Sequence, residues 1–360
     1  MPTQNSLDFF REAAPYIHQH RGKTVVLALG GNIIQHPCFV QVLKDIAILS
    51  TLGVKIVLVH GARPQVAAKL EQQQYKVLIK NDLRVTDAHT LEVAKDVIGH
   101  IRIDIENQLT HVFNSPPIIH QGIGVLSGNF ITAQPIGVLN GVDYKFTGKV
   151  RKLNTALLQD LLAQQSIVLL SPLGFSPTGE TFNLHYEDVA SFTAKRLQAD
   201  KLVFLHEEQL DLPYQADLHQ LSKLRESFSQ HQRLYQHITE SLERGVQRVH
   251  LIDARIEGSL LTELYTRDGV GTLFFAGHYD DLHAASIEHV NGILALIKPL
   301  EEKGILIKRS REQLELEITN FIVSERDKKV IACAACYPLA NTSIGELACL
   351  VVDKDYHGQN

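Results

Sequence analysis

One carboxylate near the end of the chain lies in a stretch that is otherwise apolar. Residues 344–352 read Ile-Gly-Glu-Leu-Ala-Cys-Leu-Val-Val between turn-forming residues, which is typical of a buried strand. Period-two alternation places Glu346 on the same face as Ala348 and Leu350. Because apolar surroundings raise a carboxyl pKa, Glu346 is a candidate general base. The alternative is a glutamate at the start of a strand that simply reaches water.

A second candidate is the C-x-x-C spacing of Cys333 and Cys336, which can hold a metal or form a redox pair. Both cysteines lie in the apolar, strand-like run 330–337, and no second pair accompanies them. We therefore predict core thiols here, and no metal site.

Composition limits the possible classes of function. The 360 residues are long enough for two domains, and 44% apolar with 21% charged residues is typical of a soluble globular protein. The net charge of −5 comes without acidic or basic runs, so neither nucleic acid nor a membrane is an expected partner. Residues 1–5 do not resemble a signal peptide, no apolar run is long enough to span a membrane, and four cysteines fit a reducing cytoplasm.

Most of the chain alternates between predicted strands and helices. Residues 6–20 form a predicted amphipathic helix that packs either on its own domain or on a neighbouring subunit. The alternation that follows predicts an α/β fold with a mainly parallel sheet between helices, in which ligands bind at the carboxyl ends of strands. The predicted strands are 24–29, 54–59, 166–170, 202–205 and 249–252. The predicted helices cover residues 38–52, run from Pro64 to about residue 74, and begin at Asp87.

The pattern changes after residues 275–281. A helix over 287–300, a helix capped by Ser310 with Gln313 completing a capping box, and a hairpin over 318–337 predict an α+β domain. The predicted organisation is an N-terminal helix over 1–20, an α/β domain over 21–275, a linker over 276–281 and a second domain over 282–360.

The first domain resembles the amino-acid kinase family, and acetylglutamate kinases in particular. The resemblance covers residues 20–275 and rests on the stretches at 29–32, 60–65, 84–87, 179–183 and 268–272. Phosphoryl transfer requires cations and backbone donors around the phosphoryl group. The kinases carry a lysine where this chain has Ala28, glycine where it has Ala62 and Arg63, and aspartate where it has Glu187. We therefore predict a kinase-like domain without kinase activity.

Two stretches, 250–255 and 263–269, resemble the arginine site of arginine-inhibited acetylglutamate kinases. The resemblance implies that Glu263 binds the cationic end of L-arginine, that Lys201 and His250 line the pocket, and that Gly269 offers backbone contacts. A carboxylate facing a guanidinium forms a bidentate pair. The alternative is a solvated Glu263 that pairs with Arg267 one helical turn away.

The second domain resembles the first half of a GNAT acetyltransferase, and the whole chain resembles the bacterial N-acetylglutamate synthases. The stretches 300–312 and 345–350 carry this resemblance. It implies acetyl transfer from acetyl-CoA to the α-amine of L-glutamate, with Glu346 as general base. Arg309 and backbone groups of Ile307 would bind glutamate, and backbone N–H groups of Cys349 and Leu350 would bind acetyl-CoA and the oxyanion.

The resemblance further implies a cytoplasmic, ring-like homo-oligomer, a suspected hexamer, that opens arginine biosynthesis and is inhibited by arginine. In GNAT enzymes a glycine-rich loop after this strand holds the pyrophosphate of coenzyme A. We expect the GNAT domain to be incomplete at the C-terminus, and the chain alone to transfer no acetyl group. Two alternatives stay open: a non-catalytic arginine-binding oligomer that acts as a sensor, and an active acetylglutamate kinase.

Overall fold

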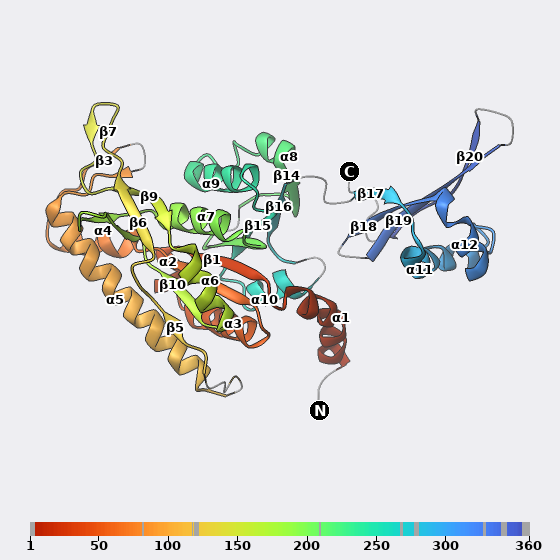
Figure 1. Ribbon diagram of the computed structural model, residues 1–360, viewed down its shortest axis with the longest axis horizontal. Helices are drawn as coiled ribbons and strands as arrows, with labels where there is room; N and C mark the ends of the chain where they lie inside the picture. Colours follow the sequence, from red (N-terminus) through yellow and green to blue (C-terminus); the bar gives the residue numbers. More distant parts are fainter. Residues whose placement is uncertain are drawn as a thin grey trace. The chain divides into compact units, whose positions relative to one another are not determined.

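The computed structural model describes residues 4–80, 83–116, 118, 122–208, 210–266, 269–276, 281–326, 329–339 and 344–354. The chain divides into two compact units, Met1–Ala276 and Gly277–Asn360, which are described separately (Figure 1). None of the helices among the described residues is long and apolar enough to cross a membrane.

A mainly parallel sheet forms the centre of the first unit. Its neighbouring strands pair in parallel, except that β15 and β16 are antiparallel. Continuous apolar runs form the central strands because both faces of the sheet are covered. In sheet order the strands are β14 (Gln215–Asp217), β16 (Thr272–Phe275), β15 (Arg248–Asp253), β13 (Lys201–His206), β1 (Thr24–Leu29), β2 (Lys55–His60), β10 (Ile167–Leu170) and β5 (Val125–Leu126).

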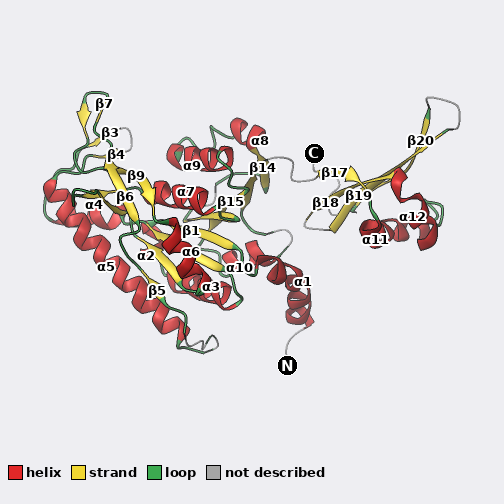
Figure 2. Ribbon diagram, in the orientation of Figure 1, coloured by secondary structure: helices red, strands yellow, loops and turns green. Residues whose placement is uncertain are grey.

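Helices cover both faces of this sheet and enclose two apolar cores (Figure 2). One core is built with α1 (Gln4–His20), α3 (Phe39–Thr51), α4 (Arg63–Gln72), α5 (Ala88–Phe113) and α10 (Ser259–Tyr265). The other core is built with α6 (Thr155–Ala163), α7 (Tyr186–Leu197), α8 (Leu218–Lys223) and α9 (Gln232–Glu243). The predicted α/β architecture is therefore confirmed, as is the cap of α5, where Asp87 accepts the Thr90 N–H at 2.9 Å.

Smaller elements extend the first unit. The short helix α2 (Gly31–Gln35) follows β1. A second sheet, in the order β12-β11-β6-β9, and the hairpin β7–β8 lie between α5 and α7, and a further hairpin, β3–β4, lies between α4 and α5. The bounds are β12 (Thr181–Asn183), β11 (Leu173–Phe175), β6 (Ile131–Pro135), β9 (Gly148–Leu153), and for the hairpins β3 (Ile79–Lys80), β4 (Leu83–Arg84), β7 (Val138–Leu139) and β8 (Val142–Asp143).

The N-terminal helix α1 packs on its own unit, which is one of the two arrangements that the sequence left open. Ala13 and His20 are buried, and the His20 ring contacts the Tyr265 ring of α10 edge-on, with centroids 5.7 Å apart. Phe9 and Phe10, however, remain exposed to 46% and 66%. The helix therefore buries one side against α10 and leaves apolar side chains accessible on another.

The second unit is an antiparallel sheet in the order β17-β18-β19-β20, packed on helices through its own apolar core. The strands are β17 (Asp281–Ala284), β18 (Phe321–Arg326), β19 (Lys329–Pro338) and β20 (Gly345–Val352); the helices are η1 (Ile287–His289), α11 (Val290–Glu302), α12 (Arg311–Glu317) and η2 (Ile318–Asn320). The predicted hairpin is confirmed by the pairing of β18 with β19.

Three local predictions in the second unit are corrected. The helix predicted over 287–300, which we expected Pro299 to end, continues through Pro299 to Glu302 as α11. Ser310 caps α12, but Gln313 does not complete a capping box, and its side-chain Nε2 donates to Glu317 at 3.1 Å. Cys333 is a core thiol as predicted, whereas Cys336 is exposed: three positions along a strand place the two thiols on opposite faces.

Candidate functional site

Three polar side chains meet inside the first unit at the predicted arginine site. His250 Nδ1 lies 2.6 Å from Glu263 Oε1, and His250 Nε2 lies 3.3 Å from Lys201 Nζ. Lys201 begins β13, His250 lies on the neighbouring β15, and Glu263 comes from α10. All three are buried. Parallel pairing and the helix after β15 thus join residues that are far apart in the sequence.

The charges of this triad follow from its contacts. Burial and the nearby Lys201 ammonium lower the pKa of His250, although Glu263 opposes this. Burial opposes ionisation of Glu263, but the hydrogen bond from His250 and two backbone N–H groups outweigh it and lower the pKa of Glu263. Neutral His250 therefore donates Nδ1–H to the carboxylate and accepts from the Lys201 ammonium, so one cation faces one anion across the ring.

The loop after α10 encloses the Glu263 carboxylate. The N–H groups of Val270 and Gly271 each donate to Oε2 at 2.8 Å. Gly269 has φ +59°, and a Cβ at this position would overlap Glu263 Oε2, so both backbone conformation and space require glycine. The alternative of a solvated Glu263 is wrong, since the residue is 9% exposed, and Arg267 lies outside the described residues.

Two neighbours of the triad were missed from the sequence. His20 of α1 is buried, and burial together with the charge of Lys201 lowers its pKa to about 4. Tyr265 of α10 is buried as well, and within the described structure its hydroxyl has no hydrogen-bond partner. The amphipathic pattern of α1 indicated a buried side for the helix but not which segment it would cover.

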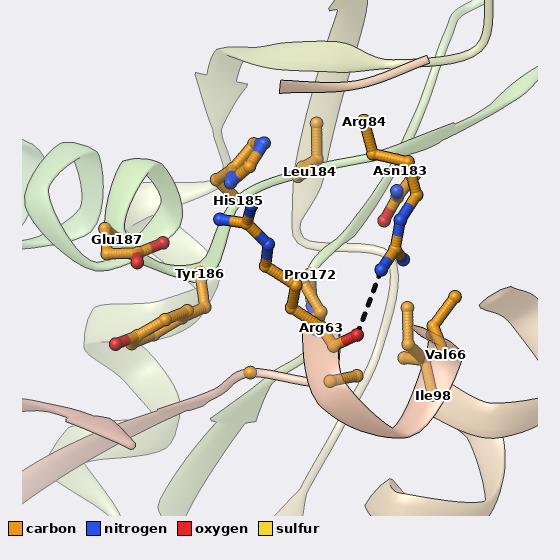
Figure 3. Close-up of a pocket in the computed structure, with 12 residues that line it drawn as sticks. Arg63, Val66, Arg84, Ile98, Pro172, Asn183, Leu184, His185, Tyr186 and Glu187 are labelled. Atoms are coloured by element: carbon orange, nitrogen blue, oxygen red, sulfur yellow. Dashed lines mark hydrogen bonds between the residues drawn. The ribbon is translucent and has the colours of Figure 1, made fainter. Parts of the chain in front are cut away.

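A cavity of 50 Å³ lies where the kinase resemblance placed phosphoryl transfer. In Figure 3 the Arg63 side chain points toward His185 and Glu187, and Arg84 approaches from the other side. Burial, followed by the charge of Arg63, lowers the pKa of Arg84 to about 10. Burial also raises the pKa of Glu187 to about 7 and lowers that of His185 well below its usual value.

Gly31, the first residue of α2, and Gly61, which lines the cavity after β2, are tightly packed by the protein itself. A Cβ on Gly31 would lie 2.6 Å from Pro64 Cδ, and a Cβ on Gly61 would lie 2.9 Å from the Gly31 nitrogen. Both contacts are closer than a Cβ tolerates. Ala28, where the kinases carry lysine, is fully buried in β1. In this chain the glycines allow close packing between loops.

In the second unit, the structure places the predicted general base differently from the expectation. Glu346 is exposed, as are its neighbours Gly345 and Leu347, so the apolar surroundings expected to raise its pKa are absent from the described structure. The alternation of β20 is interrupted by a bulge, where Ala348 pairs with Ala335 and Val351 with Cys333. Glu346 therefore reaches water, and its role as general base stays a prediction.

The same bulge positions Cys349 and Leu350. Both fall between consecutive ladder pairs, and Cys349 has φ +54°, a left-handed conformation unusual for a residue with a side chain. Bulges leave backbone groups outside the ladder and concentrate near functional sites. Cys349 is buried, whereas Leu350 is 67% exposed.

Arg309 lies close to both Ile307 and Cys349, and all three are residues that the sequence singled out. The Arg309 Nη1 lies 3.3 Å from the Ile307 carbonyl oxygen and 3.7 Å from Cys349 Sγ. The Arg309 backbone N–H donates to the Glu301 carboxylate at 2.9 Å, which anchors the segment between α11 and α12. A hydrogen bond from Cys333 lowers the pKa of the Cys349 thiol to about 7, and the charge of Arg309 acts in the same direction.

His283, His289 and Glu325 form the one group in the described part of the chain with the spacing of a metal site. The ring Nε2 atoms lie 3.5 Å and 3.4 Å from the Glu325 carboxylate. Nδ1 of His289 accepts the Ser286 backbone N–H at 2.8 Å, which places the proton of the neutral ring on Nε2. This tautomer carries a proton on Nε2 and is the wrong one for binding a metal through that atom.

Comparisons with known proteins identify the family. The amino acid kinase family model matches residues 23–209. A curated amino-acid acetyltransferase of Pseudomonas fluorescens (strain SBW25) is 46% identical over 364 residues, covering 98% of this chain and 84% of that protein. Another, from Ectopseudomonas mendocina (strain ymp), is 45% identical and covers 97% of this chain and 83% of that protein.

Among solved structures, N-acetylglutamate synthase from Neisseria gonorrhoeae complexed with coenzyme A and L-arginine matches with a TM-score of 0.88 at 35% identity. The match covers 98% of this chain and 84% of that chain. The same enzyme complexed with coenzyme A and N-acetyl-glutamate matches with a TM-score of 0.71 at 37% identity, covering 98% and 82%. The chain therefore belongs to the amino-acid acetyltransferase family, the N-acetylglutamate synthases, with an amino acid kinase family fold over residues 23–209.

Proposed function

We propose that this protein transfers the acetyl group of acetyl-CoA to the α-amine of L-glutamate, the first step of arginine biosynthesis, and that L-arginine bound to the first unit inhibits it. One observation carries the catalytic part: the Arg309 guanidinium lies beside the backbone bulge at Cys349. The guanidinium that would bind a carboxylate thus lies next to the backbone N–H groups that would bind a thioester oxygen. The relatives that bind coenzyme A with arginine or N-acetyl-glutamate support this assignment.

The acceptor amino acid binds through its carboxylate in this proposal. Arg309 presents a planar set of donors that suits a carboxylate, and its Nη1 bond to the Ile307 carbonyl orients it. Glu301 fixes the Arg309 backbone from the opposite side. Arg309 is a binding residue here, and Ile307 contributes its backbone.

The chemical step requires a neutral amine. Near neutral pH the α-amine of glutamate is mostly protonated, so Glu346 takes up its proton, and its exposed position favours transfer through a water molecule. The amine nitrogen then attacks the thioester carbonyl carbon. The developing oxyanion accepts hydrogen bonds from backbone N–H groups of Cys349 and Leu350. The carbon–sulfur bond then breaks, and the nitrogen gives its second proton to the departing sulfur, so that coenzyme A leaves as the thiol.

Arginine binds at the triad of the first unit in the same proposal. Glu263 is ionised and directed by its loop, which suits a guanidinium, and Lys201 offers a cation for the carboxylate of the effector. In the described structure His250 and two backbone N–H groups already occupy the Glu263 carboxylate. Arginine must therefore share these oxygens or displace His250.

The kinase-like domain then serves regulation and assembly. Ala28 removes a cation, and Arg63 occupies the loop beside the cavity, which supports a domain without phosphoryl transfer. The exposed Phe9 and Phe10 of α1 give a neighbouring copy an apolar contact, which supports a homo-oligomer, a hexamer in our proposal. Analytical ultracentrifugation of the protein with Phe10→Ser tests this assembly.

One assay separates the proposal from its alternatives. The protein, as its natural gene encodes it, is incubated with acetyl-CoA and L-glutamate, and release of the coenzyme A thiol is followed with and without L-arginine. Glutamate-dependent release that arginine suppresses supports the proposal. Arginine binding without any release would favour the sensor, and ATP-dependent phosphorylation of N-acetylglutamate would favour the kinase.

A further inference from the structure

Two of the four cysteines lie against one another in the second unit. Cys333 of β19 and Cys349 of β20 are buried in the same apolar core, and Cys333 Sγ lies 3.6 Å from the Cys349 carbonyl oxygen. The two thiols also share a hydrogen bond. Cys336 is exposed on the opposite face of β19, and Cys38 precedes α3 in the first unit. Cys333 and Cys349 are therefore the two thiols placed to react with each other.

The bulge of β20 holds one member of this pair in an unusual backbone conformation. Cys333 pairs with Val351 and Ala335 with Ala348, so Cys349 lies in the irregular part of the ladder, with φ +54°. A residue with a side chain adopts this conformation at a cost of about 1–3 kcal/mol, and it persists because the surrounding contacts hold it. A new covalent bond at the Cys349 sulfur would therefore change the shape of the bulge.

A cation activates one thiol of the pair. Arg309 Nη1 lies 3.7 Å from Cys349 Sγ, and a guanidinium beside a thiol favours the thiolate, which is the reactive form. The hydrogen bond from Cys333 and the Arg309 charge lower the pKa of Cys349 to about 7, although burial and the charge of Glu301 oppose this. The same hydrogen bond and burial raise the pKa of Cys333. Cys349 is thus the nucleophile of the pair, and Cys333 remains a thiol.

The position of Cys349 limits the reagent that can reach it. The residue is 5% exposed, but it contacts the half-buried Arg309 and precedes the exposed Leu350 in the chain. Its sulfur therefore lies just beneath the surface of the unit. Hydrogen peroxide is little larger than water and has an O–O bond that a thiolate cleaves, so it suits this position better than a bulky alkylating reagent.

We propose that Cys349 and Cys333 form a peroxide-sensitive pair, in which oxidation of Cys349 leads to a disulfide between β20 and β19. The Cys349 thiolate attacks one peroxide oxygen, the O–O bond breaks and hydroxide leaves, which produces a sulfenic acid. The Cys333 sulfur then attacks the Cys349 sulfur, the S–O bond breaks, and the departing hydroxide takes the Cys333 proton to form water. The two thiols together lose two electrons and two protons, and the peroxide becomes two water molecules.

The test uses the chain itself with hydrogen peroxide as the oxidant. The treated protein is unfolded, its free thiols are alkylated, and it is cleaved after glutamate, so that the cut at Glu346 separates Cys349 from Cys333. Mass spectrometry should show the loss of two of the four thiols as one disulfide within the chain, with Cys38 and Cys336 alkylated. No disulfide at Cys349, or one that joins two chains, overturns the proposal.

Variants then identify the partner of Cys349. Cys336→Ser changes an exposed residue, so this variant should fold and still form the disulfide. Cys333→Ala should stop at the sulfenic acid, which dimedone traps on Cys349. A disulfide at Cys349 that persists in Cys333→Ala, or that is missing from Cys336→Ser, assigns the partner to Cys336 and overturns the pair. The second result decides the question even where Cys333→Ala does not fold.

The consequence for activity rests on the proposed acetyl transfer, in which the Cys349 N–H binds the oxyanion. In the protein as its natural gene encodes it, the disulfide should lower the rate of N-acetylglutamate formation by about 10²-fold, and a thiol reductant should restore it. Cys336→Ser should lose activity reversibly in the same way, whereas Cys333→Ala should not. Inactivity before oxidation overturns the proposed acetyl transfer, and full activity after disulfide formation overturns control of the bulge by this pair.

Discussion

His250 and Glu263 form a buried hydrogen bond of 2.6 Å that joins β15 to α10. The carboxylate also accepts hydrogen bonds from two backbone N–H groups, so each of these hydrogen bonds favours its ionised form. On the other side of the ring, His250 faces the Lys201 ammonium at 3.3 Å. This arrangement presents an anion and a cation across one ring, which matches an amino acid that carries a guanidinium and a carboxylate.

The first prediction concerns Glu263. L-arginine should raise the melting temperature of the protein, because a ligand that binds only the folded state stabilises it by about 2.7 kcal/mol at one hundred times its Kd. Glu263→Gln keeps the shape of the side chain but removes its charge, so it should abolish the arginine-dependent shift. Glu257→Gln, an exposed glutamate before α10, should respond like wild type. An unchanged shift in Glu263→Gln removes this residue from the site.

The second prediction isolates the contact between Gly269 and Glu263. Gly269→Ala should destabilise the protein by about 1–3 kcal/mol beyond Gly258→Ala, as measured by urea unfolding. Both glycines have positive φ, +59° and +69°, but a Cβ on Gly258 meets nothing within 4 Å, whereas one on Gly269 overlaps the carboxylate. Because both variants place a side chain at a positive φ, the difference between their free energies of unfolding excludes backbone strain and leaves the cost of the overlap. Equal losses for the two variants would mean that the loop moves aside freely.

The elements of the first unit were predictable where the local pattern is strong. The strand predicted over 24–29 is β1, because a continuous apolar run buried on both faces has few alternatives. Asp87 was correctly predicted to begin α5, since its side chain accepts a hydrogen bond from a backbone N–H of the first turn that has no partner within the helix. Arg309, Ile307 and Cys349, which the sequence singled out for the second unit, lie close together, and their roles stay predictions.

The predictions that were wrong depended on contacts between distant segments. Alternation placed Glu346 among apolar neighbours, but the bulge at Cys349 shifts the side chains of β20, and Glu346 lies at its exposed start. His20 joins the triad only because α1 packs on α10. The unpartnered Nε of Arg84 follows from the way separate segments enclose a cavity, which no local pattern records.

The third prediction concerns substrate binding by Arg309. Arg309→Lys should raise the KM for L-glutamate at least tenfold with a smaller change in kcat, because a carboxylate ion pair forms before the transition state as well as in it. The KM for acetyl-CoA should change little. Arg311→Lys, on the next helix and paired with Glu315 at 2.8 Å, serves as control. If Arg309→Lys changes only the KM for acetyl-CoA, Arg309 belongs to the coenzyme site instead.

The fourth prediction concerns Glu346. Glu346→Gln should lower kcat by about 10²–10⁴-fold, because an amide keeps the size of the side chain but cannot accept a proton. Glu315→Gln, on α12, should leave kcat unchanged. The rate of the Glu346 variant should also lose part of its rise with pH. Near-normal turnover of Glu346→Gln from acid to alkaline pH would exclude this carboxylate as the base.

The fifth prediction concerns acid stability. His60 is fully buried, its Nε2 lies 2.8 Å from Ser171 Oγ, and burial lowers its pKa to about 4. The unfolded chain therefore binds more protons than the folded one between about pH 6.5 and 4, so the free energy of unfolding falls as pH falls through this range. The shift at His60 accounts for at most roughly 3 kcal/mol.

Other groups modify this dependence in known directions. Burial also lowers the pKa of His237 to about 4, so this histidine adds to the loss of stability at low pH. Burial raises the pKa of Asp45 to about 6 and that of Glu187 to about 7. These carboxyls take up protons in the folded state first, so they oppose the decline in stability as pH falls. Urea unfolding from pH 7.5 to 4.5 should therefore show a shallower decline for His60→Gln than for wild type. His100→Gln, an exposed histidine on α5, should keep the wild-type slope, and an equal slope for His60→Gln would mean that His60 is protonated in the folded protein.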